Sequence, residues 1–182
     1  GGTPSRSKKS FYGGDILWAT ISDIEKSNGR ITDTKEKITE EGLSSIGNRL
    51  FPKNTLLLSM YGSIGKTAIA GIELATNQAI LGIRPKKEDE IYLPFLSYWL
   101  QLNTKMLKHQ ARGGILKNLS AKIVRNLKID FPDYDTQINI SQLLFKIESL
   151  IQKREDSIKL LDKLIQSKFW DLFKNTLTDD KP

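Results

Sequence analysis

Cysteine is absent from this chain of 182 residues, and histidine occurs only once, at position 109. Without cysteine the chain can form no disulfide, no thiolate nucleophile and no cysteine-based zinc site. A single histidine argues against a histidine-based metal site and against a Ser-His-Asp triad. Because His109 lies between Lys108 and Gln110, we interpret it as a surface or phosphate-contact residue. Much of enzymatic chemistry is thereby excluded.

Long apolar runs are also missing, because no stretch approaches the roughly 18 to 20 residues that a bilayer-spanning helix needs. The chain opens with Gly1-Gly2-Thr3-Pro4, and no apolar segment of a secretory signal follows. We therefore expect a cytoplasmic protein with no membrane association. The length suits one domain, or one domain and an extended element, and is short for two full domains.

Acidic residues are scarce in one long segment, residues 91–129, which contains none but carries seven Lys or Arg. Residues 1–134 hold 20 Lys or Arg against 13 Asp or Glu, so the formal net charge of +7 is concentrated there. Each cation that neutralises a phosphate releases condensed counterions, and an acid-free segment is therefore typical of a polyanion-binding face. On charge alone, a solvated helix face without a ligand remains the alternative.

Turn residues alternate with short apolar stretches through the first half of the chain. Strands are expected at residues 16–21, 55–61, 67–72 and 79–83. Thr39 is placed to cap a short helix over 38–46, and a helix over 93–107 is expected to end in a basic loop at Gly113-Gly114. The pattern predicts an α+β domain with a mixed or antiparallel sheet, or a small barrel, and packed helices.

Glycine and proline are missing from residues 134–181, and the apolar residues there follow a heptad. The spacing predicts one helix over 135–176, with a tail at 177–182. About forty helical residues span on the order of 60 Å, so the helix projects or pairs. The apolar stripe fits a dimer, an antiparallel pair or a larger bundle, and a helix folded back on its own domain is the alternative. The predicted pairing residues are Leu144, Ile147, Ile151, Ile158, Leu161 and Ile165.

Two segments resemble catalytic motifs without matching them. Residues 61–67 end in Gly65-Lys66-Thr67 as a P-loop does, but the glycine required five residues before Gly65 is Met60. We therefore expect a tight glycine turn that presents Tyr61, Ser63 and Lys66 to a phosphate or a base edge, with a plain hairpin turn as the alternative. Residues 131–134 depart from the methyltransferase motif at two positions, so methyl transfer by this chain is not expected.

Six short motifs follow one another along the chain: Gly1-Gly-Thr-Pro-Ser5, Gly13-Gly-Asp-Ile-Leu-Trp18, Gly62-Ser-Ile-Gly65, Thr76-Asn-Gln-Ala-Ile80, Gly113-Gly114 with Asn118-Leu119, and Phe131-Pro132 with Gln137. As an ordered set they resemble the specificity (S) subunit of Type I restriction-modification systems. The resemblance covers nearly the whole chain. It implies a DNA target-recognition domain over 1–134 that reads one half of a split sequence. It also implies that the long helix sets the spacing between halves and docks methyltransferase (M) subunits and, through them, restriction (R) subunits.

The resemblance further implies a subunit that is not itself an enzyme. S-adenosylmethionine, ATP and Mg are then expected only on partner subunits, and no cofactor or metal on this chain. A full S subunit resembles two such units in tandem, whereas this chain has one domain and one helix. Two copies pairing through the heptad stripe as a homodimer would rebuild the two-domain arrangement. The competing hypothesis is an assembly adaptor whose helix gathers partners and whose DNA affinity is only non-specific.

On double-stranded DNA, basic residues are expected to fix the register on phosphates, while polar and aromatic loop residues reach base edges. The loops, not the long helix, are expected to read the sequence. The candidate DNA-binding residues are Arg6, Lys8, Lys9, Tyr61, Ser63, Lys66, Lys108, Arg112 and Lys117.

Overall fold

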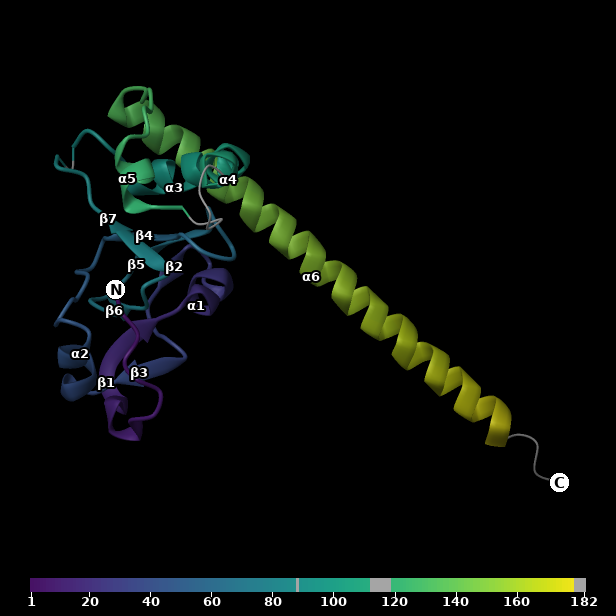
Figure 1. The fold of residues 1–182 in the computed structure, drawn as a ribbon. Helices are drawn as coiled ribbons and strands as arrows, with labels where there is room; N and C mark the ends of the chain where they lie inside the picture. The colour runs from purple at the N-terminus through teal and green to yellow at the C-terminus, as the bar shows by residue number, and fades with distance from the viewer. Residues whose placement is uncertain (88, 112–118, 179–182) are drawn as a thin grey trace. The chain divides into compact units, whose positions relative to one another are not determined.

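The computed structural model describes residues 1–87, 89–111 and 119–178 (Figure 1). The chain divides into two units, of which the first comprises residues 1–138 and the second begins at residue 139. All the strands and the shorter helices that the structure describes belong to the first unit. Helix α6 spans Tyr134–Thr178, so its first turn belongs to the first unit and the remainder forms the second.

A four-stranded sheet with the order β2-β5-β4-β7 forms one layer of the first unit. Its strands are β2 (Arg30–Ile31), β4 (Leu56–Ser59), β5 (Thr67–Ala70) and β7 (Ile80–Ile83). β4 pairs antiparallel with β5 and β7, whereas β2 pairs parallel with β5. Side chains alternate along β4, so Leu56 and Leu58 join one hydrophobic cluster and Leu57 joins another. The sheet is therefore buried on both faces, which explains its continuous apolar strands.

A smaller sheet has the order β3-β1-β6, with β1 (Tyr12–Ala19) antiparallel to β3 (Glu36–Ile38) and parallel to β6 (Ala75–Thr76). Its core residues are Trp18, Ile38, Leu43 and Ala75. Leu43 comes from α2 (Glu40–Ser45), which is shorter than the predicted 38–46 because Ile38 ends β3. Thr39 caps the helix as expected, since its hydroxyl accepts a hydrogen bond from the Gly42 N–H at 3.1 Å.

The strand expected over residues 16–21 was placed too late in the sequence, because β1 begins at Tyr12 and ends at Ala19, and helix α1 (Ile21–Lys26) follows. Thr20 begins that helix through a capping box: its N–H donates to the Asp23 carboxylate at 2.8 Å, and its hydroxyl donates to the same oxygen at 2.7 Å. The carboxylate also accepts the Lys35 N–H at 2.9 Å. These hydrogen bonds therefore start a helix at a point where the apolar pattern alone predicted a continued strand.

The helix expected over residues 93–107 is two helices, α3 (Leu93–Leu102) and α4 (Thr104–Ala111). Side chains at the junction compete with the backbone ladder, because the Asn103 amide donates to the Trp99 carbonyl at 2.8 Å and the Thr104 hydroxyl donates to the Gln101 carbonyl at 2.6 Å. Both helices still bury their apolar faces against the four-stranded sheet. Together with α5 (Ala121–Arg125) they gather at one end of the first unit (Figure 1).

The first turn of α6 is held to the first unit by Gln137, whose side chain is fully buried. Its Oε1 accepts the Tyr92 N–H at 2.9 Å, and its Nε2 donates to the carbonyls of Glu90 at 3.0 Å and Pro132 at 2.9 Å. A single amide thus joins the segment before α3 to the segment before α6. Buried backbone groups that have no helix or sheet partner are satisfied in this way.

Asp133 caps the same helix. One carboxylate oxygen accepts the Thr136 N–H at 2.9 Å and the other accepts the Thr136 hydroxyl at 2.6 Å. These bonds from Thr136, the side-chain bond foremost, favour the charged carboxylate and hold the pKa of Asp133 below its ordinary value.

The predicted α+β fold class is confirmed, with mixed sheets, packed helices and a long C-terminal helix. The long helix begins at Tyr134 and ends at Thr178, close to the predicted range of 135–176. Residues 179–182 of the predicted tail lie outside the described residues. The predicted loop at Gly113-Gly114 lies outside them as well.

Candidate nucleic-acid interface

The connection between β4 and β5 is a tight loop at residues 60–66. Gly62 and Gly65 adopt φ angles of 61° and 89°, the left-handed region that glycine occupies most readily. A Cβ on Gly65 would also overlap the Thr104 hydroxyl, so the loop lies directly against the start of α4. The sequence Gly-Ser-Ile-Gly therefore supplies both the turn and the close approach.

Backbone hydrogen bonds make this loop a fixed element. The Ser59 N–H donates to the Lys66 carbonyl at 2.9 Å, the Gly65 N–H to the Ser59 carbonyl at 3.2 Å, and the Lys66 N–H to the Ser63 carbonyl at 3.2 Å. Ile64 turns inward and joins the core with only 8% of its surface exposed. The loop is anchored by one apolar side chain while its polar residues stay accessible.

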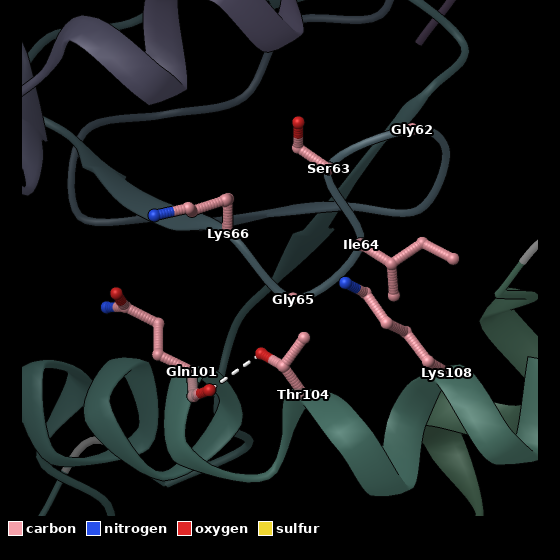
Figure 2. A pocket seen from close by; sticks show the side chains of 8 residues that line it. All are labelled: Gly62, Ser63, Ile64, Gly65, Lys66, Gln101, Thr104 and Lys108. Atoms are coloured by element: carbon pink, nitrogen blue, oxygen red, sulfur yellow. Dashed lines mark hydrogen bonds between the residues drawn. The ribbon is translucent and has the colours of Figure 1, made fainter.

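Helices α3 and α4 present a polar face to the loop. Gln101, Thr104 and Lys108 follow one another at intervals of three and four residues, which places them on the same side of consecutive helical turns. Leu100 and Leu107 are buried in the core on the opposite side. Figure 2 shows the three polar residues rising from the helices toward the glycine loop.

A cleft of about 380 Å³ separates the loop from the two helices. Lys66 extends from the loop and Lys108 from α4, so two cations come from opposite walls (Figure 2). Both lysines are exposed, and neither forms an ion pair with any residue that the structure describes. The cleft is lined by Gly62, Ser63, Ile64, Gly65, Lys66, Gln101, Thr104 and Lys108.

Three of the predicted DNA-binding residues, Ser63, Lys66 and Lys108, are therefore brought together in space. The Ser63 hydroxyl donates a hydrogen bond to the Glu25 carboxylate, so its proton is already engaged within the fold. Tyr61 is half-buried and does not line the cleft. Its carbonyl accepts the Ser59 hydroxyl at 3.0 Å, which helps to hold the turn.

Arg6 is held within a different cluster. Its guanidinium pairs with both oxygens of Glu36, at 2.5 and 3.1 Å, and lies 4.6 Å from the ring centroid of Tyr12 and 5.3 Å from that of Trp18. The hydrogen bond from Arg6 to Glu36 raises the pKa of Arg6 above its ordinary value. The contacts of Arg6 thus stabilise the loop before β1, and they occupy the two nitrogens that a bidentate base contact would use.

Lys8 and Lys9 lie next to Arg6 at the short helix η1 (Lys9–Phe11). The Lys8 ammonium lies 5.0 Å from the centroid of the Phe11 ring, and both lysines are exposed. This loop lies with β1 and β3, whereas the cleft lies with α3 and α4 (Figure 1). The predicted DNA-binding residues therefore form two separate groups.

The acid-free segment contributes further exposed cations around α4 and α5. None of them makes an ion pair within the part of the chain that is described. Unpaired exposed cations are what a polyanion-binding surface needs. They are Lys105, Lys122, Arg125 and Lys128. Arg112 and Lys117, also predicted to bind DNA, lie outside the described residues.

Gln101 and Thr104 line the cleft but were not among the predicted site residues. A sequence signal for them exists, because their spacing to Lys108 continues a polar helix face opposite the leucines. Within the described ranges no cluster of three or more His, Cys, Asp or Glu side chains is arranged to hold a metal ion. No described helix is both long enough and apolar enough to cross a bilayer.

The chain belongs to the family of the Type I restriction modification DNA specificity domain, whose family model matches residues 1–160. It is 31% identical over 185 residues to the Type I restriction enzyme MjaIX specificity subunit of Methanocaldococcus jannaschii, covering 100% of this chain and 41% of that subunit. It is 29% identical over 133 residues to the HindI specificity subunit of Haemophilus influenzae, covering 72% and 29% of the two chains. The resemblance inferred from the ordered motifs is confirmed.

Two solved structures share the fold. One is a chain from work on complex assembly and conformational transition of the type I R-M system, with a TM-score of 0.63 and 19% identity over 84% of this chain and 35% of that one. The other is the HsdS subunit from Thermoanaerobacter tengcongensis, with a TM-score of 0.59 and 17% identity over 83% and 34%. The chain therefore spans less than half the length of these relatives and carries a single recognition domain.

Proposed function

We propose that this chain reads one half of a bipartite sequence in double-stranded DNA on behalf of a Type I restriction-modification complex. The observation that carries the proposal is the meeting of Lys66 and Lys108 in one polar cleft, in a domain whose family is defined by DNA specificity. Two cations that the fold does not pair are free to meet an anionic ligand. The acid-free α4–α5 segment extends the same positive charge.

Recognition divides between positioning and reading. Exposed lysines around the cleft and at η1 meet phosphates and set the register, because a phosphate contact carries no sequence information of its own. Loop residues then reach the base edges, where direct readout has its donor and acceptor pattern. The rigid glycine loop supports this division, since it holds its polar residues on a backbone already fixed by hydrogen bonds.

Helix α6 serves assembly in this proposal. Five of the predicted pairing residues are 44–66% exposed, and a contiguous apolar stripe of this kind marks an interaction surface. We assign it to a second helix, supplied by a second copy of the chain in a homodimer, and to the M subunits, through which R subunits join. The five residues are Ile147, Ile151, Ile158, Leu161 and Ile165.

We assign catalysis to the M and R subunits. A chain without cysteine and with one histidine is poorly equipped for catalysis, so we assign S-adenosylmethionine, ATP and Mg to the partner subunits and a non-catalytic role to this one. The complex acts on DNA in the cytoplasm.

A selection from random duplex DNA tests this function, run at about physiological salt on the chain alone and with its cognate M subunit. Enrichment of a short motif is expected, and two copies of the motif at fixed spacing are expected if the chain pairs. Absence of enrichment under both conditions, with residual sequence-blind binding, would instead favour an assembly adaptor with non-specific DNA affinity.

A further inference from the structure

We infer that the cleft between the glycine loop and helices α3 and α4 holds one phosphate of the DNA backbone, gripped from both walls by Lys66 and Lys108. The inference rests on the proposed DNA-binding function and deepens it, because it assigns both lysines of the cleft to one and the same phosphate. The two lysines then act as one site, not as two independent contacts.

The charge of the cleft suits a single phosphate. No carboxylate belongs to its described lining, and the two ammonium groups come from elements that are far apart in the sequence. Glu25 is not part of that lining, but its carboxylate accepts the hydroxyl of Ser63, a lining residue, and so one acid borders the cleft there. A phosphate in the cleft would meet a cation on each wall.

The backbone of the loop also carries N–H donors that have no acceptor within the described part of the chain. Among the described residues, none accepts a hydrogen bond from the N–H of Gly62, Ser63 or Ile64, so these donors are not used by the fold. The absence of a side chain on Gly62 lets a ligand come close to the backbone. Because the loop is already fixed by its own hydrogen bonds, little ordering is needed on binding.

The charged side chains of the cleft favour positioning over base reading. Base readout uses directional groups, such as an amide paired with both edges of adenine or a guanidinium paired with guanine. Here one N–H of the Gln101 side-chain amide donates to the Ser97 hydroxyl at 3.2 Å, and the Thr104 hydroxyl donates to the backbone carbonyl of Gln101 at 2.6 Å. The only charged groups of the described lining are the two ammonium groups, and a lysine ammonium is a compact point charge without preferred orientation.

The test compares Lys66→Gln, Lys108→Gln and the double variant with the parent chain on two duplexes, one carrying the selected motif and one unrelated. Dissociation constants are measured over a range of salt concentrations. Both lysines are exposed, so all three variants are expected to fold, and thermal unfolding checks this. Lys53→Gln, an exposed lysine in the turn before β4, is the matched control and should leave the salt slope unchanged.

If both lysines hold the same phosphate, the double variant should reduce the salt slope by about 0.9, the value for one phosphate contact. Two separate phosphates would give about 1.8 and overturn the inference. Affinity should fall by the same factor on both duplexes. A loss confined to the motif duplex would show base reading and would equally overturn it.

A scan of the DNA phosphates tests whether the two lysines share one of them. Neutral methylphosphonate is placed at one backbone position after another, and a single position should weaken the parent chain while leaving the double variant unaffected. If every position weakens both proteins alike, the shared phosphate does not exist. The proposed function fails separately, when the parent chain binds the motif duplex and the unrelated duplex equally well.

Discussion

Gln137 gives the sharpest stability prediction, because its amide is fully buried and satisfies three backbone groups at once. Gln137→Met removes the polar atoms and keeps a straight side chain of similar length. The Tyr92 N–H and the carbonyls of Glu90 and Pro132 would then lose this partner inside the protein. The first turn of α6 would no longer be tied to the segment before α3.

The size of the effect follows from the groups left behind. An unsatisfied buried donor or acceptor costs ~1–3 kcal/mol, and backbone carbonyls recover partners more easily than an N–H does. We expect the free energy of unfolding to fall by about 3 kcal/mol, which for a unit of this size lowers Tm by about 10 °C. Gln142→Met, at an exposed position further along α6, is the matched control and should change stability by less than about 0.5 kcal/mol.

Urea unfolding followed by tryptophan fluorescence, to which the buried Trp18 contributes, measures both variants. A Gln137→Met chain as stable as the control variant would refute the reasoning. Gln137→Glu adds a pH test, because a buried carboxylate facing two carbonyls has a raised pKa. The loss in free energy of unfolding caused by Gln137→Glu should be small below about pH 4.3, the ordinary pKa of glutamate. It should grow as the pH rises toward the raised pKa of this carboxyl in the folded protein.

Three further predictions concern the loop, the helix cap and the long helix. Gly62→Ala should lower the free energy of unfolding by about 1 kcal/mol, because an alanine there must adopt a left-handed backbone conformation. Gly65→Ala should lower it further, because its Cβ would also overlap the start of α4. Equal losses for the two variants in urea unfolding would contradict the packing described. NMR titration of Asp133 should show a pKa below the ordinary value. The ionised Asp133 then stabilises the fold at pH values above its pKa in the unfolded chain, and this contribution is lost as the pH falls through the lowered pKa of the folded protein. An ordinary value would show that the cap does not persist in solution. Ile158→Asp should abolish association in sedimentation velocity while Lys163→Asp, outside the apolar stripe, should not; a parent chain that stays monomeric at high concentration rules out the homodimer.

Much of the fold could be predicted because local signals agree with the tertiary structure. Thr39 both precedes an apolar pattern and has a backbone N–H to accept, and α6 combines a heptad with an absence of glycine and proline. Strands β4, β5 and β7 were expected close to where they lie, because their apolar runs are bounded by turn residues. In these segments propensity, pattern and packing favour the same structure.

Two elements differ from the prediction because side-chain hydrogen bonds override apolar continuity. The run through Ile21 looks like one strand, but the Thr20 to Asp23 capping box starts a helix there. The leucine spacing through residues 93–107 looks like one helix, but Asn103 and Thr104 bond back to carbonyls of the preceding turn. Both signals are present in the sequence, yet their strength depends on the surrounding structure.

The site could be predicted only in outline. Charge and glycine spacing single out Lys66 and Lys108, but only the packing of the loop on α4 places them in one cleft. The sequence also could not separate Arg6 from them, because its partner Glu36 and its two aromatic neighbours are contributed by the small sheet. A cation that the fold occupies looks the same in a sequence as one that it leaves for a ligand.

Sequence recognition itself is tested most directly by the ratio of two affinities, measured at about physiological salt on the selected duplex and on the same duplex with its enriched positions scrambled. Each base pair that is read contributes ~1–3 kcal/mol, so scrambling even two of them should weaken binding by at least about thirtyfold. We expect a ratio of that size or larger. A ratio near one, at any affinity, would mean that the chain binds DNA through its charge alone and reads no sequence.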